Sequence, residues 1–179
     1  RFFDNPNDVV YIEEDIKEKL LMMKEVSELL RMQREALGAI EFETSESEFI
    51  VDANGVVLDI KEKERGQGEM MIEDFMVAAN QCAASLFDNA NIPTLYRVHE
   101  KPPLKKMTTL SATLRILGYR LKGSLDNVYP TDIQRVLYHF RNEPTFHVIS
   151  NLILRSMAKA KYHPEHLGHF GLGLKHYLH

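Results

Sequence analysis

The sequence contains few of the residues that build cross-links or membrane spans. Cys82 is its single cysteine, and no tryptophan occurs among the 179 residues. One cysteine excludes an internal disulfide and a Cys-x-x-Cys pair, which favours a reducing compartment, so we expect a cytoplasmic protein. The longest apolar stretch, around residues 75–87, is interrupted by Asn80 and Gln81. It is far shorter than the ~20 residues of a membrane helix, and we expect no membrane span.

Common catalytic signatures are also missing. The chain has no G-x-x-x-x-G-K-[ST], no G-x-S-x-G and no H-E-x-x-H motif. It therefore lacks the usual signatures of nucleotide-binding proteins, hydrolases and zinc proteases. It also has no tight run of aspartates of the kind that holds two metal ions. The glycines at 168, 171 and 173 do not lie between a strand and a helix, as those of a phosphate loop would. The residues alone therefore indicate no catalytic centre.

Charge is unevenly distributed along a chain of otherwise ordinary composition. With 44% hydrophobic and 27% charged residues, the sequence is typical of one globular domain. The net charge is −4, but residues 1–75 hold 9 Lys/Arg against 20 Asp/Glu, whereas residues 76–179 hold 13 against 6. Seven of the eight histidines lie between His139 and His179. The basic part suits a polyanionic partner; the alternative is that the two parts neutralise each other.

Hydrophobic periodicity predicts a helix-rich α+β unit. Apolar residues at helical spacing predict a helix over 10–37 that ends at Gly38, and Ile40 with Phe42 then alternates as in a half-buried strand. Asn54-Gly55 between apolar runs predicts an antiparallel hairpin over 49–60 in which both central residues have positive φ. A helix over 69–89 is apolar nearly all round, which indicates burial. A short strand over 95–99 and helices over 107–117, from Pro130 and from Pro144 complete the unit.

Glu73 and Asn80 are the most informative polar pair. They lie seven residues apart, and therefore on one face of the predicted 69–89 helix. A carboxylate on a buried helix needs a partner, which is either a protein cation, with Arg97 or Arg65 as candidates, or a ligand that enters the site. Phe42 has a similar pair of interpretations, as a core residue or as a ring that stacks on a base.

The histidines near the C-terminus suggest a metal site only weakly. His163, His166 and His169 recur at intervals of three, and His176 and His179 follow. Imidazoles at this spacing can share a cation, but Pro164 and Gly168 interrupt the helix that would align them. We therefore favour histidines that are solvated or face an anion. A histidine-ligated metal protein remains the alternative.

Several segments together resemble the catalytic (RNB) domain of the ribonuclease II and ribonuclease R family. They occur in the family's order with similar spacing over nearly the whole chain, and the R-V-H-E-K-P segment is more similar to the ribonuclease R branch. The segments are G-A-I-E-F (38–42), I-E-D-F-M-V-A-A-N (72–80), Y-R-V-H-E-K-P (96–102), L-R-S-M-A-K-A-K-Y (154–162) and G-H-F-G-L (168–172).

The resemblance implies a 3′-to-5′ exoribonuclease that draws single-stranded RNA into a narrow channel. Such an enzyme releases nucleoside 5′-monophosphates and uses magnesium ions to activate water. By motif match, Phe42 would be one aromatic of the clamp that stacks on terminal bases, and Glu73 would contact a nucleotide near the 3′ end. The other RNA-binding residues that we expect within the matching segments are Asn80, Arg97, His99 and His169.

Other parts of the family pattern have no equivalent here. The metal-binding aspartate cluster and a second clamp aromatic lie upstream of the matching segments, and the catalytic arginine lies downstream of the Y-x-H at 177–179. We therefore expect residues 1–179 to be an internal part of a single RNB catalytic domain, with no catalytic residue and no bound metal of its own. We expect this part to be inactive alone and to self-associate through exposed apolar surface. The alternative is a non-catalytic helical module that binds RNA or protein.

Overall fold

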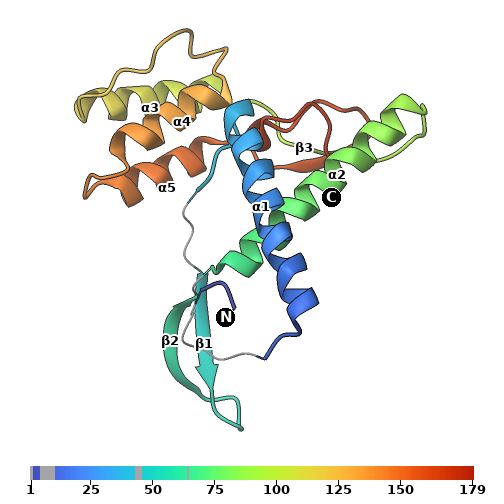
Figure 1. Ribbon diagram of the computed structural model, residues 1–179. Coiled ribbons are helices and arrows are strands. Elements are labelled where there is room, and N and C mark those ends of the chain that lie inside the picture. The colour runs from blue at the N-terminus through green and yellow to red at the C-terminus, as the bar shows by residue number, and fades with distance from the viewer. Residues whose placement is uncertain (1, 5–10, 43–45, 64) are drawn as a thin grey trace.

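Two long helices form the centre of the molecule. The computed structural model describes residues 2–4, 11–42, 46–63 and 65–179. Helix α1 (Glu14–Leu37) has acidic residues in its first turn, where the helix dipole favours them, and ends at Gly38, whose φ is 101°. Helix α2 (Gln67–Asn89) crosses α1 at a steep angle (Figure 1). The Asp4 carboxylate accepts a hydrogen bond from the Gln67 backbone N–H at 2.7 Å, which satisfies one of the free donors at the start of α2.

A buried ion network joins α1 to α2. One carboxylate oxygen of Asp74 accepts hydrogen bonds from Ser27 Oγ and Arg31 Nη2, each at 2.7 Å. The other accepts from Arg34 Nη2 at 2.5 Å. The side chain of Asp74 is only 1% exposed, and that of Arg34 is 10% exposed. This acid on α2 is therefore matched by two arginines from α1, and the contact fixes how the helices cross.

The prediction that the second helix is buried all round is wrong. Its buried residues form a single stripe, Met71, Asp74, Val77 and Ala84. Ile72 on another face is 60% exposed and Leu86 is 65% exposed. The described residues that cover α2 belong to α1, to the 96–98 strand and to the C-terminal segment, and its other faces keep exposed apolar side chains. None of the described helices is both long and apolar enough to cross a bilayer.

The predicted hairpin forms, but with a different turn. Strands β1 (Glu46–Val51) and β2 (Val57–Lys63) pair antiparallel and project away from the helices (Figure 1). Of the two turn residues, only Gly55 has positive φ, at 81°. Asp52 explains the difference, because its Oδ1 accepts hydrogen bonds from the backbone N–H groups of Asn54 and Val56. These hydrogen bonds to the Asp52 side chain stabilise the turn in place of those of a two-residue hairpin turn. The register of the two paired strands shifts between Ile50 and Val51.

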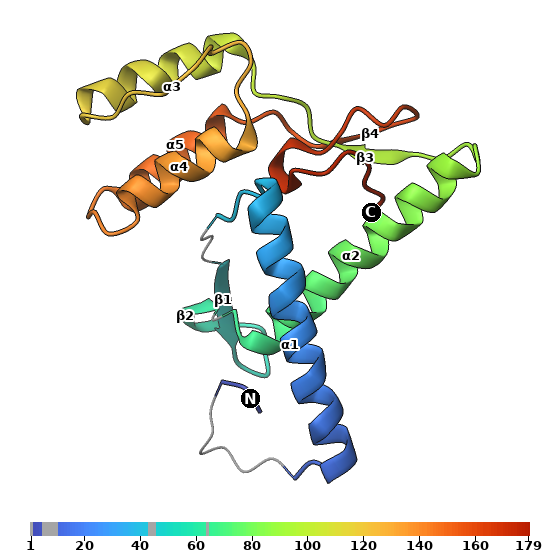
Figure 2. The ribbon, with the colours of Figure 1, turned by 45° about the horizontal axis from the view of Figure 1, so that its top comes forward.

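Three shorter helices enclose the main hydrophobic core. They are α3 (Leu104–Ile116), α4 (Pro130–Phe140) and α5 (Phe146–Ser156), and they gather on one side of the molecule (Figure 2). Their best-buried side chains include Leu114, Ile133 and Ile149, each fully inaccessible to solvent. The Asp132 carboxylate accepts a hydrogen bond from the Tyr129 backbone N–H at 2.9 Å, which caps the start of α4. The three predicted helices are thus confirmed within a few residues at each end.

The C-terminal segment connects the other parts. Strand β3 (Tyr96–Val98) pairs antiparallel with β4 (Lys161–His163), a strand that periodicity did not predict. The short 3-10 helix η1 (Phe170–Leu172) accepts a hydrogen bond from Ile40 N–H at the Gly171 carbonyl. The predicted strand at Ile40 and Phe42 is therefore absent, because this backbone pairs with η1 and not with an extended partner. The helix-rich α+β prediction is confirmed, with two small antiparallel sheets.

Candidate functional site

Two packed histidines, His99 and His169, lie beside η1. Their rings are edge to face with centroids 5.3 Å apart. The Gly171 backbone N–H donates to His99 Nδ1 at 3.1 Å, and the Leu172 N–H donates to His169 Nδ1 at 3.2 Å. Because Nδ1 accepts in both rings, the neutral tautomer carries its proton on Nε2. His99 Nε2 is buried, and the Ala158 backbone lies close enough to this ring to act on its pKa.

Both rings are held neutral at pH 7. Burial lowers the pKa of His99 below its usual value. Burial also lowers the pKa of His169, to about 4, and the neighbouring His99 lowers it further. These two histidines therefore offer hydrogen bonds and aromatic faces at neutral pH, and they do not add positive charge to the basic part of the chain.

Asn80 and Arg97 approach the same C-terminal segment. Asn80 Nδ2 donates to the Tyr177 hydroxyl at 3.3 Å, and the Tyr177 ring packs edge to face on His169 with centroids 5.3 Å apart. The Arg97 backbone N–H donates to the Tyr177 carbonyl at 2.8 Å. Its guanidinium lies over the Tyr162 ring, 4.9 Å from the centroid. Four of the six predicted RNA-binding residues thus lie around the C-terminal segment.

Glu73 and Phe42 do not join this group. The side chain of Glu73 is 43% exposed and forms an ion pair with Arg65, which was one of its two predicted protein partners. The prediction of a buried carboxylate at this position is wrong, because the buried acid is the next residue, Asp74. Along α2, Glu73 is also ~10 Å from Asn80 at 1.5 Å per residue. Phe42 is partly buried and packs against the main core cluster.

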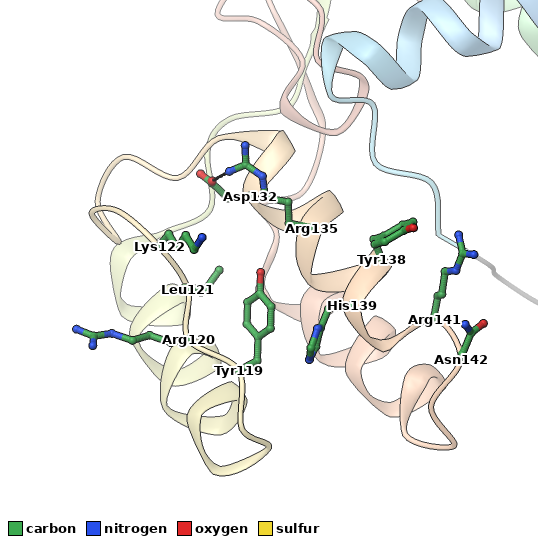
Figure 3. Close-up of a pocket in the computed structure, with 10 residues that line it drawn as sticks. All are labelled: Tyr119, Arg120, Leu121, Lys122, Asp132, Arg135, Tyr138, His139, Arg141 and Asn142. Carbon is green, nitrogen blue, oxygen red and sulfur yellow. Dashed lines mark hydrogen bonds and ion pairs between the residues drawn. The ribbon is translucent and has the colours of Figure 1, made fainter.

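A basic cavity lies between the loop at 119–122 and α4, and the sequence did not predict it. It has a volume of about 520 Å³ and opens among cationic and aromatic side chains (Figure 3). Tyr119 packs on His139 with ring centroids 4.9 Å apart, and the Arg141 guanidinium lies 4.6 Å from the Tyr138 centroid. Arg120 and Lys122 line it as well, and Arg135 is paired with Asp132 at 3.1 Å. In the sequence, the signal for this cavity is the run of Tyr, Arg and Lys at 119–122. These residues lie on a loop, and hydrophobic periodicity does not predict where a loop lies in the fold.

The sequence and the fold match those of one protein family. The sequence profile of the RNB domain matches residues 3–179, and the chain belongs to this family. Among curated relatives, it is 38% identical over 165 residues to ribonuclease R of Aquifex aeolicus, which covers 92% of this chain and 23% of the relative. It is 36% identical over 179 residues to ribonuclease R of Thermotoga maritima, covering 99% of this chain and 25% of the relative.

Comparison with solved structures also indicates similarity to ribonuclease R. The apo form of Mycoplasma genitalium RNase R superposes with a TM-score of 0.91 at 31% identity, over 98% of this chain and 27% of that one. The same TM-score is obtained with that protein in complex with ribose methylated single-stranded RNA and with double-stranded RNA. The chain thus spans about a quarter of the length of the relatives that it matches.

Proposed function

We propose that this chain is part of a single RNB catalytic domain of a 3′-to-5′ exoribonuclease and lines part of its RNA channel. The parent enzyme would hydrolyse single-stranded RNA to nucleoside 5′-monophosphates with magnesium, in the cytoplasm. The observation that carries this proposal is the RNB match over residues 3–179. The structures of an RNase R with single-stranded and double-stranded RNA support RNA as the partner.

The residues of this chain do not fit the magnesium site of such an enzyme. Magnesium takes oxygen ligands, usually from carboxylates, phosphates and water. Among the described residues, the one group of three side chains whose possible ligand atoms converge is Asp88, His166 and His176, of which two are imidazoles. We therefore infer that the chain binds RNA without cleaving it, and that the metal ligands belong to other parts of the parent enzyme.

The chain's own contribution is to hold and orient RNA. The neutral Nε2–H group of His169 suits hydrogen bonds to phosphate, ribose or base oxygens, the His99 ring packs against it, and the Arg97 guanidinium supplies charge beside them. Asn80 adds a further polar side chain nearby, held by its hydrogen bond to the hydroxyl of the buried Tyr177. The cavity lined by Arg120, Lys122, Arg135 and Arg141 supplies a second region where aromatic rings and cations lie together, a combination that binds single strands with little sequence preference.

Exposed apolar surface supports self-association of the chain when it is isolated. Met22 and Leu29 on α1 are 65% and 64% exposed, and Ile72 and Leu86 on α2 are exposed to a similar degree. Apolar side chains left this open on two long helices favour contact with another apolar surface. In the parent enzyme we propose that other parts of the protein cover them.

Replacing Phe42 by alanine tests the clamp proposal. If the ring stacks on a base, the variant binds oligo(A) more weakly by ~1–3 kcal/mol, which corresponds to roughly 5- to 150-fold in Kd. Fluorescence anisotropy with a labelled oligo(A) measures the change. Phe146→Ala is the matched control, because Phe146 is also partly buried and packs against the same core cluster. Equal losses in both variants would mean that Phe42 acts through the core and would overturn its stacking role.

A further inference from the structure

Three potential metal ligands from distant parts of the chain meet at one end of α2. Asp88 lies in the last turn of α2, His166 follows β4, and His176 lies in the C-terminal segment. His166 Nε2 is 3.3 Å from Asp88 Oδ1, and His176 Nδ1 is 3.8 Å from Asp88 Oδ2. The possible ligand atoms of all three residues lie within 4.8 Å of one another. The two imidazole rings pack edge to face with centroids 4.8 Å apart.

These separations suit a tetrahedral ion. Zinc binds histidine nitrogen and carboxylate oxygen at ~2.0–2.2 Å, so two ligand atoms on a tetrahedron lie about 3.3 Å apart. The distance from His166 Nε2 to Asp88 Oδ1 already has that value, and His176 Nδ1 is 3.8 Å from the other carboxylate oxygen, Oδ2. The three ligand atoms lie within 4.8 Å of one another, so rotation of the Asp88 carboxylate and of the two imidazole rings would bring them onto one ion. The backbone segments need not move.

A second observation points to a ligand at the same place. His176 Nδ1 is buried and has no hydrogen-bond partner among the described residues. A buried polar atom without a partner is costly, and a bound cation would satisfy it. His166 is 49% exposed on its side chain, so the fourth coordination position would face solvent and hold water. Tyr96 packs edge to face on the His166 ring, 5.7 Å between centroids, and restricts its rotation.

We propose that Asp88, His166 and His176 bind one divalent transition-metal ion, with zinc as the ion that their chemistry fits best. Two imidazoles and one carboxylate select zinc, cobalt or nickel and disfavour magnesium, which takes oxygen ligands. The site is therefore separate from the magnesium chemistry proposed for the parent enzyme. The ion ties the end of α2 to the segment after β4 and to the C-terminal segment, and it acts as a structural cross-link of the β3–β4 region.

Zinc titration of the metal-free chain tests this proposal. After dialysis against EDTA and its removal, calorimetry with zinc chloride is expected to give one site per chain, together with a rise in Tm. Millimolar magnesium should leave both unchanged. His176→Ala and the shape-conserving Asp88→Asn should each weaken zinc binding by at least ~10–100-fold, the range for disturbing a ligand's surroundings alone. His147→Ala is the control, because His147 lies exposed on α5 outside the cluster.

Cobalt substitution adds a readout that does not depend on stability. A tetrahedral cobalt complex at this site should give visible absorption in the unsubstituted chain that Asp88→Asn lacks, while circular dichroism shows that the variant is folded. Absence of stoichiometric zinc binding would overturn the proposal. So would equal zinc affinity in the unsubstituted chain, Asp88→Asn and His176→Ala, because that result would assign the metal to scattered surface histidines.

Discussion

Replacing Asp74 by alanine is expected to lower the free energy of unfolding by about 3–5 kcal/mol. The reason is the charge left behind. Asp74 accepts hydrogen bonds from Arg31 and Arg34 at 2.7 and 2.5 Å, and from Ser27 at 2.7 Å. Without it, the one acidic partner that the described part of the chain offers to the buried Arg34 guanidinium is Glu41, 3.8 Å away. The hydrogen bond from Arg31 to Asp74 also raises the pKa of Arg31, which shows that the cation is held in its charged form.

Urea unfolding followed by circular dichroism measures this loss. Asp15→Ala is the matched control, since Asp15 is an exposed acid whose partner, Lys19, lies one turn away on the same helix at 3.3 Å. An exposed pair of this kind contributes only ~0.3–0.5 kcal/mol. Similar small losses for Asp74→Ala and Asp15→Ala would show that the Asp74 network does not hold α1 against α2.

Acid is expected to destabilise the chain through His169. The pKa of His169 is lowered to about 4 by burial and by His99, whereas a histidine in the unfolded chain titrates near its ordinary pKa of 6.5. The unfolded state therefore binds the proton first as pH falls, and the contribution of His169 to stability is lost between about pH 6.5 and pH 4. Allowing for the part of the ring that water reaches, the loss is roughly 2 kcal/mol over that window.

Unfolding free energies at pH 7, 5 and 4 test this contribution. His169→Asn keeps an oxygen that can accept the Leu172 N–H and removes the titrating ring, so its stability should depend less steeply on pH than that of the unsubstituted chain. His147→Asn is the control, because His147 is exposed on α5. An unchanged pH dependence in His169→Asn would show that other groups cause the acid sensitivity.

Local signals predicted most elements correctly. Gly38 and Gly118 end helices with positive φ, as expected from glycine after the last apolar residue of a helical pattern. The hairpin followed from Asn54-Gly55 between apolar runs, although Asp52 determines the form of its turn. These features depend on residues that are close in sequence, and sequence patterns report such interactions well.

Features that depend on distant residues were missed. Helical periodicity places Glu73 and Asp74 100° apart on α2, but it does not say which of them faces α1, and the carboxylate predicted to be buried is the more exposed of the two. The strand expected at Ile40 and Phe42 failed because its backbone pairs with η1, over 130 residues later. Asp88 was not considered beside the histidines for the same reason. Resemblance to a family supplied Asn80, Arg97, His99 and His169 as a set, which periodicity alone did not.

Salt-dependent binding of single-stranded RNA is the most direct test of the central claim, that this chain lines part of an RNA channel but does not itself hold the magnesium site. Anisotropy of a labelled oligo(A), with magnesium present, is measured over a range of salt concentrations, and the RNA length is checked on a gel after each titration. We expect the logarithm of the affinity to fall linearly with the logarithm of the salt concentration, with a slope of ~0.7 for each phosphate contacted, while the RNA stays intact. Binding that does not depend on salt, or magnesium-dependent shortening of the RNA that EDTA abolishes, would contradict it.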